Sequence, residues 1–324
     1  MLEVAYKIDH TSILAKDIAK AFGQKYDAPR FEIKKDHIEA SIEFYKLHEH
    51  LSVQISKFQQ NEPIKVRRLG TENNDLLILD FHLTGAAKLR FTDNKINEVT
   101  NCLMHGVYFA NGSVESYAIF PPGSYNEQFH IVMDKNWVGS FFSEEIEFIM
   151  GKIEKASPFF MHERLNSKIT ALLISVFKSD FKTHFRKAFL YGKTLELLSL
   201  FFGKLLNRGS HLELGVSSYD DVSRLFDLMT YIDEHLGEEL KVLDLSKKIG
   251  FSESKLQNLC KAVYGKSISK EITERRMIKA LDMLSENNDS VSAVGYKLGY
   301  TNMSHFAGAF KKVHGFLPSE YLNK

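Results

Sequence analysis

The sequence predicts an α+β protein with two domains, of which the first is rich in β-strands and the second contains only helices. Three observations support this fold class. Residues 31–135 contain many short segments in which apolar and polar residues alternate. Residues 143–207 change to the spacing of amphipathic helices, and residues 219–324 contain a helical pattern that occurs twice. The 324 residues are enough for two domains that each bury a core.

The first domain, residues 1–210, begins with the strand-rich region at about 31–135. Apolar and polar residues alternate strictly over Ile38–Tyr45, which is typical of a half-buried strand. The other expected strands are Leu51–Phe58, Leu76–Leu83, Lys88–Phe91, Gly106–Phe109, Tyr117–Phe120 and Phe129–Met133. Short strands separated by glycine and proline favour an antiparallel barrel or sandwich, and a small barrel can hold one ligand.

Helices follow at about 143–207. We expect them over Glu144–Lys155, with Ser143 as N-cap, then over Leu165–Phe177 and Phe185–Leu206. The last is apolar around most of its circumference, so it must be buried on several sides. It packs against its own strands, forms a subunit interface, or does both. Glycines and serines at 211–218 predict a linker to the second domain, residues 219–324.

The second domain contains an internal repeat. Each copy has a short amphipathic helix, a Gly-aromatic turn, a Ser or Thr N-cap, a second helix and a final glycine. The turns are Gly250-Phe251-Ser252 and Gly299-Tyr300-Thr301. This pattern predicts two helix-turn-helix units.

The second helix of each unit has an apolar face and a polar face. The apolar positions are Leu256, Leu259, Cys260 and Val263 in the first unit and Phe306, Ala309, Phe310 and Val313 in the second. In a DNA reader the polar face enters the major groove, where Gln and Asn pair with adenine and Lys reaches guanine. Residues 241–324 also carry 14 Lys or Arg against 8 Asp or Glu, an excess that suits phosphate binding.

These residues resemble the AraC/XylS family of transcription regulators over about a hundred positions. The matching residues are Tyr231-Ile232, Gly250-Phe251-Ser252, Leu256, Gly265, Ile272, Arg276-Met277, Ala280, Leu284, Gly299-Tyr300, Phe306, Phe310-Lys311-Lys312 and Gly315 to Tyr321. The resemblance implies two helix-turn-helix units joined by a long helix and docked in successive major grooves. It also implies an N-terminal cupin-like barrel followed by helices that dimerise.

The side chains expected to contact DNA are Ser254, Lys255, Gln257, Asn258 and Lys261 in the first unit, Arg276 on the joining helix, and Asn302, Ser304, His305, Lys311 and Lys312 in the second unit. Arg276 is expected either to contact phosphate or to hold the domain together. The chain departs from the family where it has Asn258 and Gly308, because arginine is common at both positions, and Cys260 replaces a usual phenylalanine. Since glycine removes a possible contact, we expect the first unit to carry more of the sequence readout.

The resemblance further implies the partners of a regulator. They are double-stranded DNA, RNA polymerase, a small-molecule effector in the first domain and a second copy of the chain. The segments Phe81–Gly85 and Lys193–Leu198 resemble a pyochelin-regulator-like subgroup that senses ferric siderophores. A first domain that responds to a protein partner is the alternative. The sequence does not distinguish an activator from a repressor.

Other classes of function are disfavoured. His48-Glu49-His50 would project two imidazoles from one face of a strand, but the further ligands of a metal-dependent cupin enzyme do not follow it, so we expect no metal, no cofactor and no enzymatic activity. Nucleophile and phosphate-loop motifs are missing from the sequence. No apolar run approaches the roughly 20 residues of a membrane helix, and the start of the chain does not resemble a signal peptide. With only Cys102 and Cys260, the chain suits a reducing cytoplasm.

Overall fold

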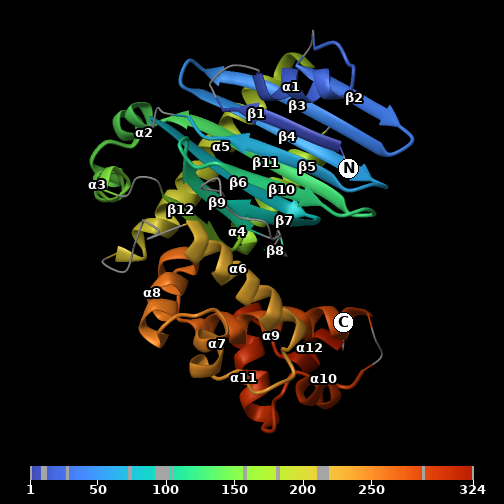
Figure 1. Cartoon of the computed structure of the whole chain (residues 1–324), viewed down its shortest axis with the longest axis vertical. Coiled ribbons are helices and arrows are strands. Elements are labelled where there is room, and N and C mark those ends of the chain that lie inside the picture. Colours follow the sequence, from blue (N-terminus) through green and yellow to red (C-terminus); the bar gives the residue numbers. More distant parts are fainter. Residues whose placement is uncertain are drawn as a thin grey trace. The chain divides into compact units, whose positions relative to one another are not determined.

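A computed structural model describes residues 2–8, 13–26, 29–71, 75–91, 102–103, 106–155, 159–179, 183–209, 219–286 and 289–322 (Figure 1). The chain forms two compact units, with the change from the first to the second near Ser223. The first unit contains the strands and the second contains only helices. The linker expected at 211–218 lies outside the described residues, and the domain boundaries stay predictions.

The larger sheet of the first unit has seven described strands, all paired antiparallel in the order β12-β9-β6-β11-β4-β3-β2 (Figure 1). Their bounds are β2 Arg30–Lys35, β3 Ile38–His48, β4 Leu51–Gln60, β6 Leu76–Thr84, β9 Gly106–Asn111, β11 Tyr125–Asp134 and β12 Phe160–Glu163. Five of the predicted strands therefore lie in this sheet, as β3, β4, β6, β9 and β11. Strands β2 and β12 were not among the predicted strands, because charged or mixed residues obscure their pattern.

The smaller sheet contains β1 Leu2–Lys7, β5 Ile64–Leu69, β7 Ala86–Phe91, β8 Cys102–Leu103 and β10 Ser116–Phe120, in the order β1-β5-β10-β7-β8. Strand β1 pairs with β5 in parallel, and the other described pairs are antiparallel. The described strands thus form two open sheets, and the single closed cupin-like barrel that we expected is not found among them. Alternation specifies which face of a strand is buried but not whether a sheet closes on itself.

The helices of the first unit are α1 Ile13–Ala21, α2 Lys135–Phe142, the short 3-10 helix η1 Ser143–Ile146, α3 Glu147–Lys155, α4 Ser167–Lys178 and α5 Thr183–Leu206. Ser143 was predicted as an N-cap, and this is wrong. The helical region starts at Lys135 because the Asp134 carboxylate accepts hydrogen bonds from the backbone N–H groups of Asn136 and Trp137 at 2.7 and 3.1 Å. Ser143 instead ends α2, and its hydroxyl donates to the Ser140 carbonyl.

The main core of the first unit lies between one face of the larger sheet and helices α2 to α5. Phe81 and Phe109 of the sheet contact Phe201 of α5 edge to face, with ring centroids 6.4 and 5.3 Å apart. Leu197, Leu198, Phe201, Phe202 and Leu205 of α5 are almost completely buried, whereas Leu200 is half-buried. Packing within its own unit therefore accounts for most of the apolar circumference of α5, and a subunit interface on this helix stays a prediction.

A buried ion pair fixes the start of α5 against the larger sheet. The Arg186 guanidinium donates through Nε and Nη2 to the two carboxylate oxygens of Glu43 on β3, at 2.9 and 3.2 Å. Arg186 also donates to the Val176 carbonyl and the Ser179 hydroxyl at the end of α4. This pair explains why Glu43 is buried although its position in the alternating segment predicts an exposed side chain.

The second unit consists of seven described helices (Figure 1). They are α6 Tyr219–Glu234, α7 Val242–Lys248, α8 Glu253–Tyr264, α9 Ile268–Glu286, α10 Val291–Lys297, α11 Met303–His314 and α12 Pro318–Leu322. The pairs α7–α8 and α10–α11 are the two predicted helix-turn-helix units, and α9 joins them. None of the helices in the described parts of either unit combines the length and apolar character required to cross a membrane.

Candidate nucleic-acid interface and ligand cavity

The first helix-turn-helix unit turns at Gly250, whose φ of 71° lies in the left-handed region that favours glycine. The Phe251 ring is buried beneath the turn, and the Ser252 hydroxyl accepts the backbone N–H of Lys255 at 3.2 Å. Ser252 therefore caps α8, as its sequence position predicted. The Lys255 ammonium lies 4.2 Å from the centroid of the Phe251 ring, a cation–π contact that holds the lysine at the start of the reading helix.

Helix α8 presents the two faces that its sequence predicts. Leu256, Leu259 and Cys260 are buried. The exposed members of the predicted reading face are Ser254, Lys255, Asn258 and Lys261. Burial raises the pKa of the Cys260 thiol, so this cysteine acts as a small core residue.

Gln257 differs from the other predicted readers. Its side chain is half-buried, and its Oε1 accepts the backbone N–H of Ile268 at the start of α9, at 3.3 Å. The side chain thereby links α8 to the joining helix. A glutamine engaged with the backbone of its own domain has to break that bond before it can pair with a base, so the structure gives Gln257 a positioning role.

The second helix-turn-helix unit turns at Gly299, with φ of 80°, and its reading helix α11 starts after Asn302. The Asn302 Oδ1 accepts the backbone N–H of His305 at 3.1 Å, so Asn302 is the N-cap of α11, and the prediction of Thr301 as N-cap is wrong. The other predicted readers of this unit, Ser304, His305, Lys311 and Lys312, are exposed. Gly308 is also exposed, and a Cβ atom there would meet nothing within 4 Å, so this reading face is bare where it has room for a side chain.

Arg276 connects three parts of the second unit. Its Nε donates to the Leu236 carbonyl at 2.9 Å and its Nη2 to the Glu238 carbonyl at 2.7 Å, which fixes the segment after α6. Its guanidinium also lies 5.7 Å from the centroid of the Tyr300 ring in the second turn. Of the two roles that the sequence left open for Arg276, these bonds favour the one that holds the domain together.

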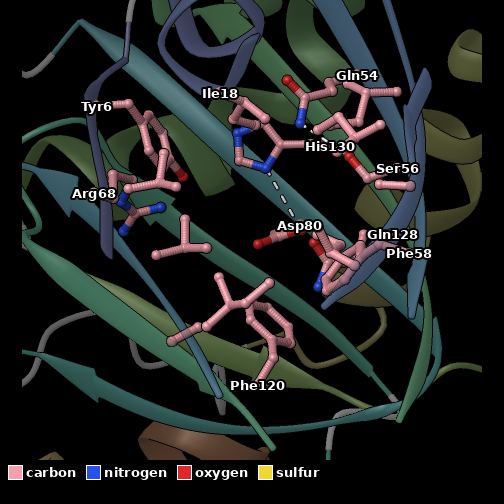
Figure 2. Close-up of a pocket in the computed structure, with 18 of the residues that line it drawn as sticks. Tyr6, Ile18, Gln54, Ser56, Phe58, Arg68, Asp80, Phe120, Gln128 and His130 are labelled. Carbon is pink, nitrogen blue, oxygen red and sulfur yellow. Dashed lines mark hydrogen bonds and ion pairs between the residues drawn. The ribbon is translucent and has the colours of Figure 1, made fainter. Parts of the chain in front are cut away.

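A cavity lies between the two sheets of the first unit, and Figure 2 shows the side chains that line it. Its volume is about 110 Å³ when measured as the space open to the centre of a water molecule. One end is apolar, where the Phe58 and Phe120 rings meet edge to face with centroids 4.9 Å apart. The other end carries polar side chains. We did not expect this cavity to have a polar end.

Asp80 is the charged centre of that polar end. Its carboxylate oxygens lie 3.2 Å from His82 Nε2 and 3.5 Å from His130 Nδ1. Burial by itself raises the pKa of this carboxyl, but the two histidines outweigh that effect and hold the pKa well below its usual range. Asp80 is therefore ionised at neutral pH.

The polar end could have been recognised from the sequence by comparing strands. Gln54 and Ser56 on β4, Asp80 and His82 on β6, and Gln128 and His130 on β11 are pairs of polar residues two positions apart. Each pair flanks an apolar residue that points into the helix-covered core. On one strand this pattern indicates a solvent-facing side. On three neighbouring strands it indicates a polar surface inside the sandwich.

The histidine pair considered for a metal site does not lie on one strand. Strand β3 ends at His48 and the chain reverses at Glu49 and His50, where His48 Nδ1 accepts the His50 backbone N–H at 3.3 Å. The His48 ring also stacks on Trp137, with centroids 5.8 Å apart. In the part of the chain that the structure describes, no three His, Cys, Asp or Glu side chains are arranged to hold a metal ion.

Comparisons with known proteins identify the second unit. Residues 245–324 match the family model of a helix-turn-helix domain. The regulatory protein SoxS of Escherichia coli strain K12 is 28% identical over 98 residues, which cover 30% of this chain and 92% of that protein. The transcriptional activator RhaS of Enterobacter sp. strain 638 is 28% identical over 116 residues, covering 36% of this chain and 41% of RhaS. The match to the activator RhaR of Mannheimia succiniciproducens, 22% identical over 107 residues, covers 33% of this chain and 39% of RhaR.

The chain is also similar to solved structures. A Chromobacterium violaceum regulator described as an AraC-type DNA-binding domain-containing protein is 22% identical, with 33% of this chain and 95% of that chain covered and a TM-score of 0.31. ToxT of Vibrio cholerae is 14% identical, with 85% of this chain and 98% of that chain covered and a TM-score of 0.35. Residues 245–324 thus carry an AraC-type helix-turn-helix domain, with AraC-family homologues among the relatives.

Proposed function

We propose that this chain is a sequence-specific DNA-binding transcription regulator. The observation that carries the proposal is the pair of helix-turn-helix units, each with a buried apolar face and an exposed polar face on its second helix. Exposed Asn258 and Lys261 offer groups that read base edges or bind phosphate in the major groove. The similarity of residues 245–324 to AraC-type regulators supports the same function.

The first unit supplies the signal in this proposal. A small-molecule effector binds the cavity between the sheets and changes the disposition or dimerisation of the DNA-binding domains, which changes promoter occupancy and the recruitment of RNA polymerase. The regulator acts in the cytoplasm as a homodimer. The segment Phe81–Gly85, which resembles the siderophore-sensing subgroup, places His82 in the cavity wall. A cavity of about 110 Å³ is close to the roughly 150 Å³ that holds a benzene molecule, so it takes a small ligand or one ring of a larger one.

The exposed polar residues of the first helix-turn-helix unit are expected to dominate sequence discrimination. Replacing Asn258 with alanine should reduce the preference for the cognate site over a scrambled site by about 10-fold, the effect of one lost bidentate base contact. His305→Ala should cost less, because its neighbours on α11 include the bare position Gly308. The measurement is a binding titration of both duplexes at one fixed salt concentration.

Asn136→Ala is the control for these variants, since Asn136 is an exposed asparagine on α2 of the strand-rich unit, outside both helix-turn-helix units. It should leave both affinities unchanged. A larger loss of discrimination from His305→Ala than from Asn258→Ala would overturn the prediction that the first helix-turn-helix unit carries more of the sequence readout. Equal affinity of the unmodified chain for cognate and scrambled DNA would overturn the proposed function itself.

A further inference from the structure

The polar end of the cavity is built from two rows of side chains that cross three neighbouring strands. In the register of the larger sheet, His130 on β11 pairs with Gln54 on β4 and with Asp80 on β6. Two residues further along, Gln128 pairs with Ser56 and with His82. Because residues two apart share a face of a sheet, all six side chains face the cavity. Figure 2 labels Gln54, Ser56, Asp80, Gln128 and His130 there.

The first row leaves hydrogen-bond acceptors without donors. Gln54 donates through its Nε2 to the Ser56 hydroxyl at 3.0 Å, and its Oε1 is buried without a partner. His130 directs Nδ1 toward Asp80, and its other ring nitrogen, Nε2, is buried without a partner. Oδ1 of Asp80 lies 3.5 Å from His130 Nδ1 and is buried without a shorter hydrogen bond.

Buried polar atoms of folded proteins are almost always hydrogen-bonded, so a row of such atoms facing a cavity calls for a ligand that supplies the missing donors. Gln54 and His130 are both more than nine-tenths buried. Among the described side chains that line the cavity, Asp80 is the only carboxylate. Its negative charge attracts hydroxyl and ammonium groups and repels the head of an acid.

The opposite wall sets the shape of the ligand. On the smaller sheet the chain passes from Ile64 through Val66 to Arg68, from the apolar end toward the polar end. Phe58 and Phe120 close the apolar end. A ligand that fills the cavity therefore has an apolar body and one polar head. Arg68 is the one lysine or arginine among the described lining residues, and it is the group that an acidic head would approach.

We propose that the cavity binds a small amphipathic molecule whose head donates hydrogen bonds, a hydroxyl or an amine, to the row formed by Gln54, His130 and Asp80. This rests on the proposed function only in assigning the cavity to an effector. The binding chemistry itself follows from the first row.

The test uses four probes with one phenyl body: phenylpropanol, phenylpropylamine, phenylpropanoate and propylbenzene. Thermal unfolding of the full chain is followed with each probe, because a ligand of the native state raises the melting temperature. The alcohol, the amine or both should stabilise the chain more than propylbenzene and the acid do. The alcohol and amine arms separate the two donor heads. Stabilisation by the acid alone, stabilisation by propylbenzene equal to that by the alcohol and amine, or no stabilisation by any probe would overturn the proposal.

Two variants locate the binding. Asp80→Asn should weaken the affinity for the stabilising probe about tenfold or more, since it replaces a charge-assisted hydrogen bond by a neutral one. Gln54→Leu removes the neighbouring acceptor and should also weaken it, which keeps the test valid where Asp80→Asn does not fold. Asp75→Asn is the control, because Asp75 pairs with Lys135 outside the cavity. Unchanged probe affinity in both cavity variants would contradict the assignment.

DNA binding is measured in parallel without any probe. Probe binding that is lost in the cavity variants, together with an unmodified chain that does not prefer any DNA sequence, would remove the proposed function and leave the cavity chemistry standing. A chain that prefers its DNA site but binds none of the donor-headed probes would support the proposed function and overturn the cavity proposal.

Discussion

Replacing Arg276 with alanine is expected to destabilise the DNA-binding domain by about 2–4 kcal/mol, because the change removes two charge-assisted hydrogen bonds to backbone carbonyls. The Leu236 and Glu238 carbonyls would lose their donor, and the Tyr300 ring would lose the guanidinium beside it. For a domain of this size such a loss lowers the melting temperature by roughly 10 °C or more. Thermal or denaturant unfolding followed by circular dichroism measures it.

Two further variants separate this role from a phosphate contact. Lys279→Ala is the control, since Lys279 is an exposed cation on the same helix α9. Arg276→Lys keeps the charge but not the planar fork, so it should not restore the stability. A variant Arg276→Ala with unchanged stability, and with a salt dependence of DNA affinity lowered by about one phosphate contact, would contradict the structural role.

Replacing Glu43 with alanine is expected to destabilise the first unit by about 3–5 kcal/mol, the cost of leaving a buried charge without its partner. Glu43 and Arg186 are both buried and share two hydrogen bonds across the packing of α5 on the larger sheet. Without the carboxylate, the Arg186 guanidinium stays buried against two neutral acceptors at the end of α4. Denaturant unfolding of the full chain, followed by near-ultraviolet circular dichroism, measures the change.

The matched control is Glu39→Ala, because Glu39 lies on the same strand with its side chain exposed. It should change stability by well under 1 kcal/mol. The double variant Glu43→Leu with Arg186→Met should recover most of the loss, since an apolar pair of similar volume often replaces a buried ion pair without cost. A Glu43→Ala chain as stable as the Glu39→Ala chain would show that the pair contributes nothing.

The second unit could be predicted in detail because its signals are local. Gly250 and Gly299 have the positive φ angles that their turns require, and Ser252 caps α8 as its position indicates. Helical spacing identified the buried face of α8 correctly. In α11 it identified the buried Phe306 and Phe310, but Ala309 is half-buried and Val313 is exposed, contrary to the prediction. These features depend on neighbours within a few residues, which a single sequence displays directly.

The roles of individual polar residues could not be predicted from spacing. Gln257 and Asn302 were expected as DNA contacts, and a phosphate contact was one of two roles expected for Arg276, yet each is engaged with the backbone of its own domain. A polar side chain on the outer face of a helix can cap a neighbouring helix as readily as it can meet a base. Which of the two occurs depends on residues that are distant in sequence, such as Ile268 for Gln257.

The first unit was predicted less completely because its important relations are between strands. Alternation correctly placed β3, β4, β6 and β11, but it gave no order of strands and no closure. The burial of Glu43 depends on Arg186, which is far away in the chain. The sequence of each strand contains its polar residues, but their arrangement in rows follows only from the register of the three strands.

The central claim is sequence-specific DNA binding by the two helix-turn-helix units. It is tested most directly by selecting bound duplexes from random double-stranded DNA with the purified full chain at physiological salt. We expect one enriched sequence, bound about a thousandfold or more tighter than random DNA. Affinity for the selected sequence that equals the affinity for random DNA would contradict the account.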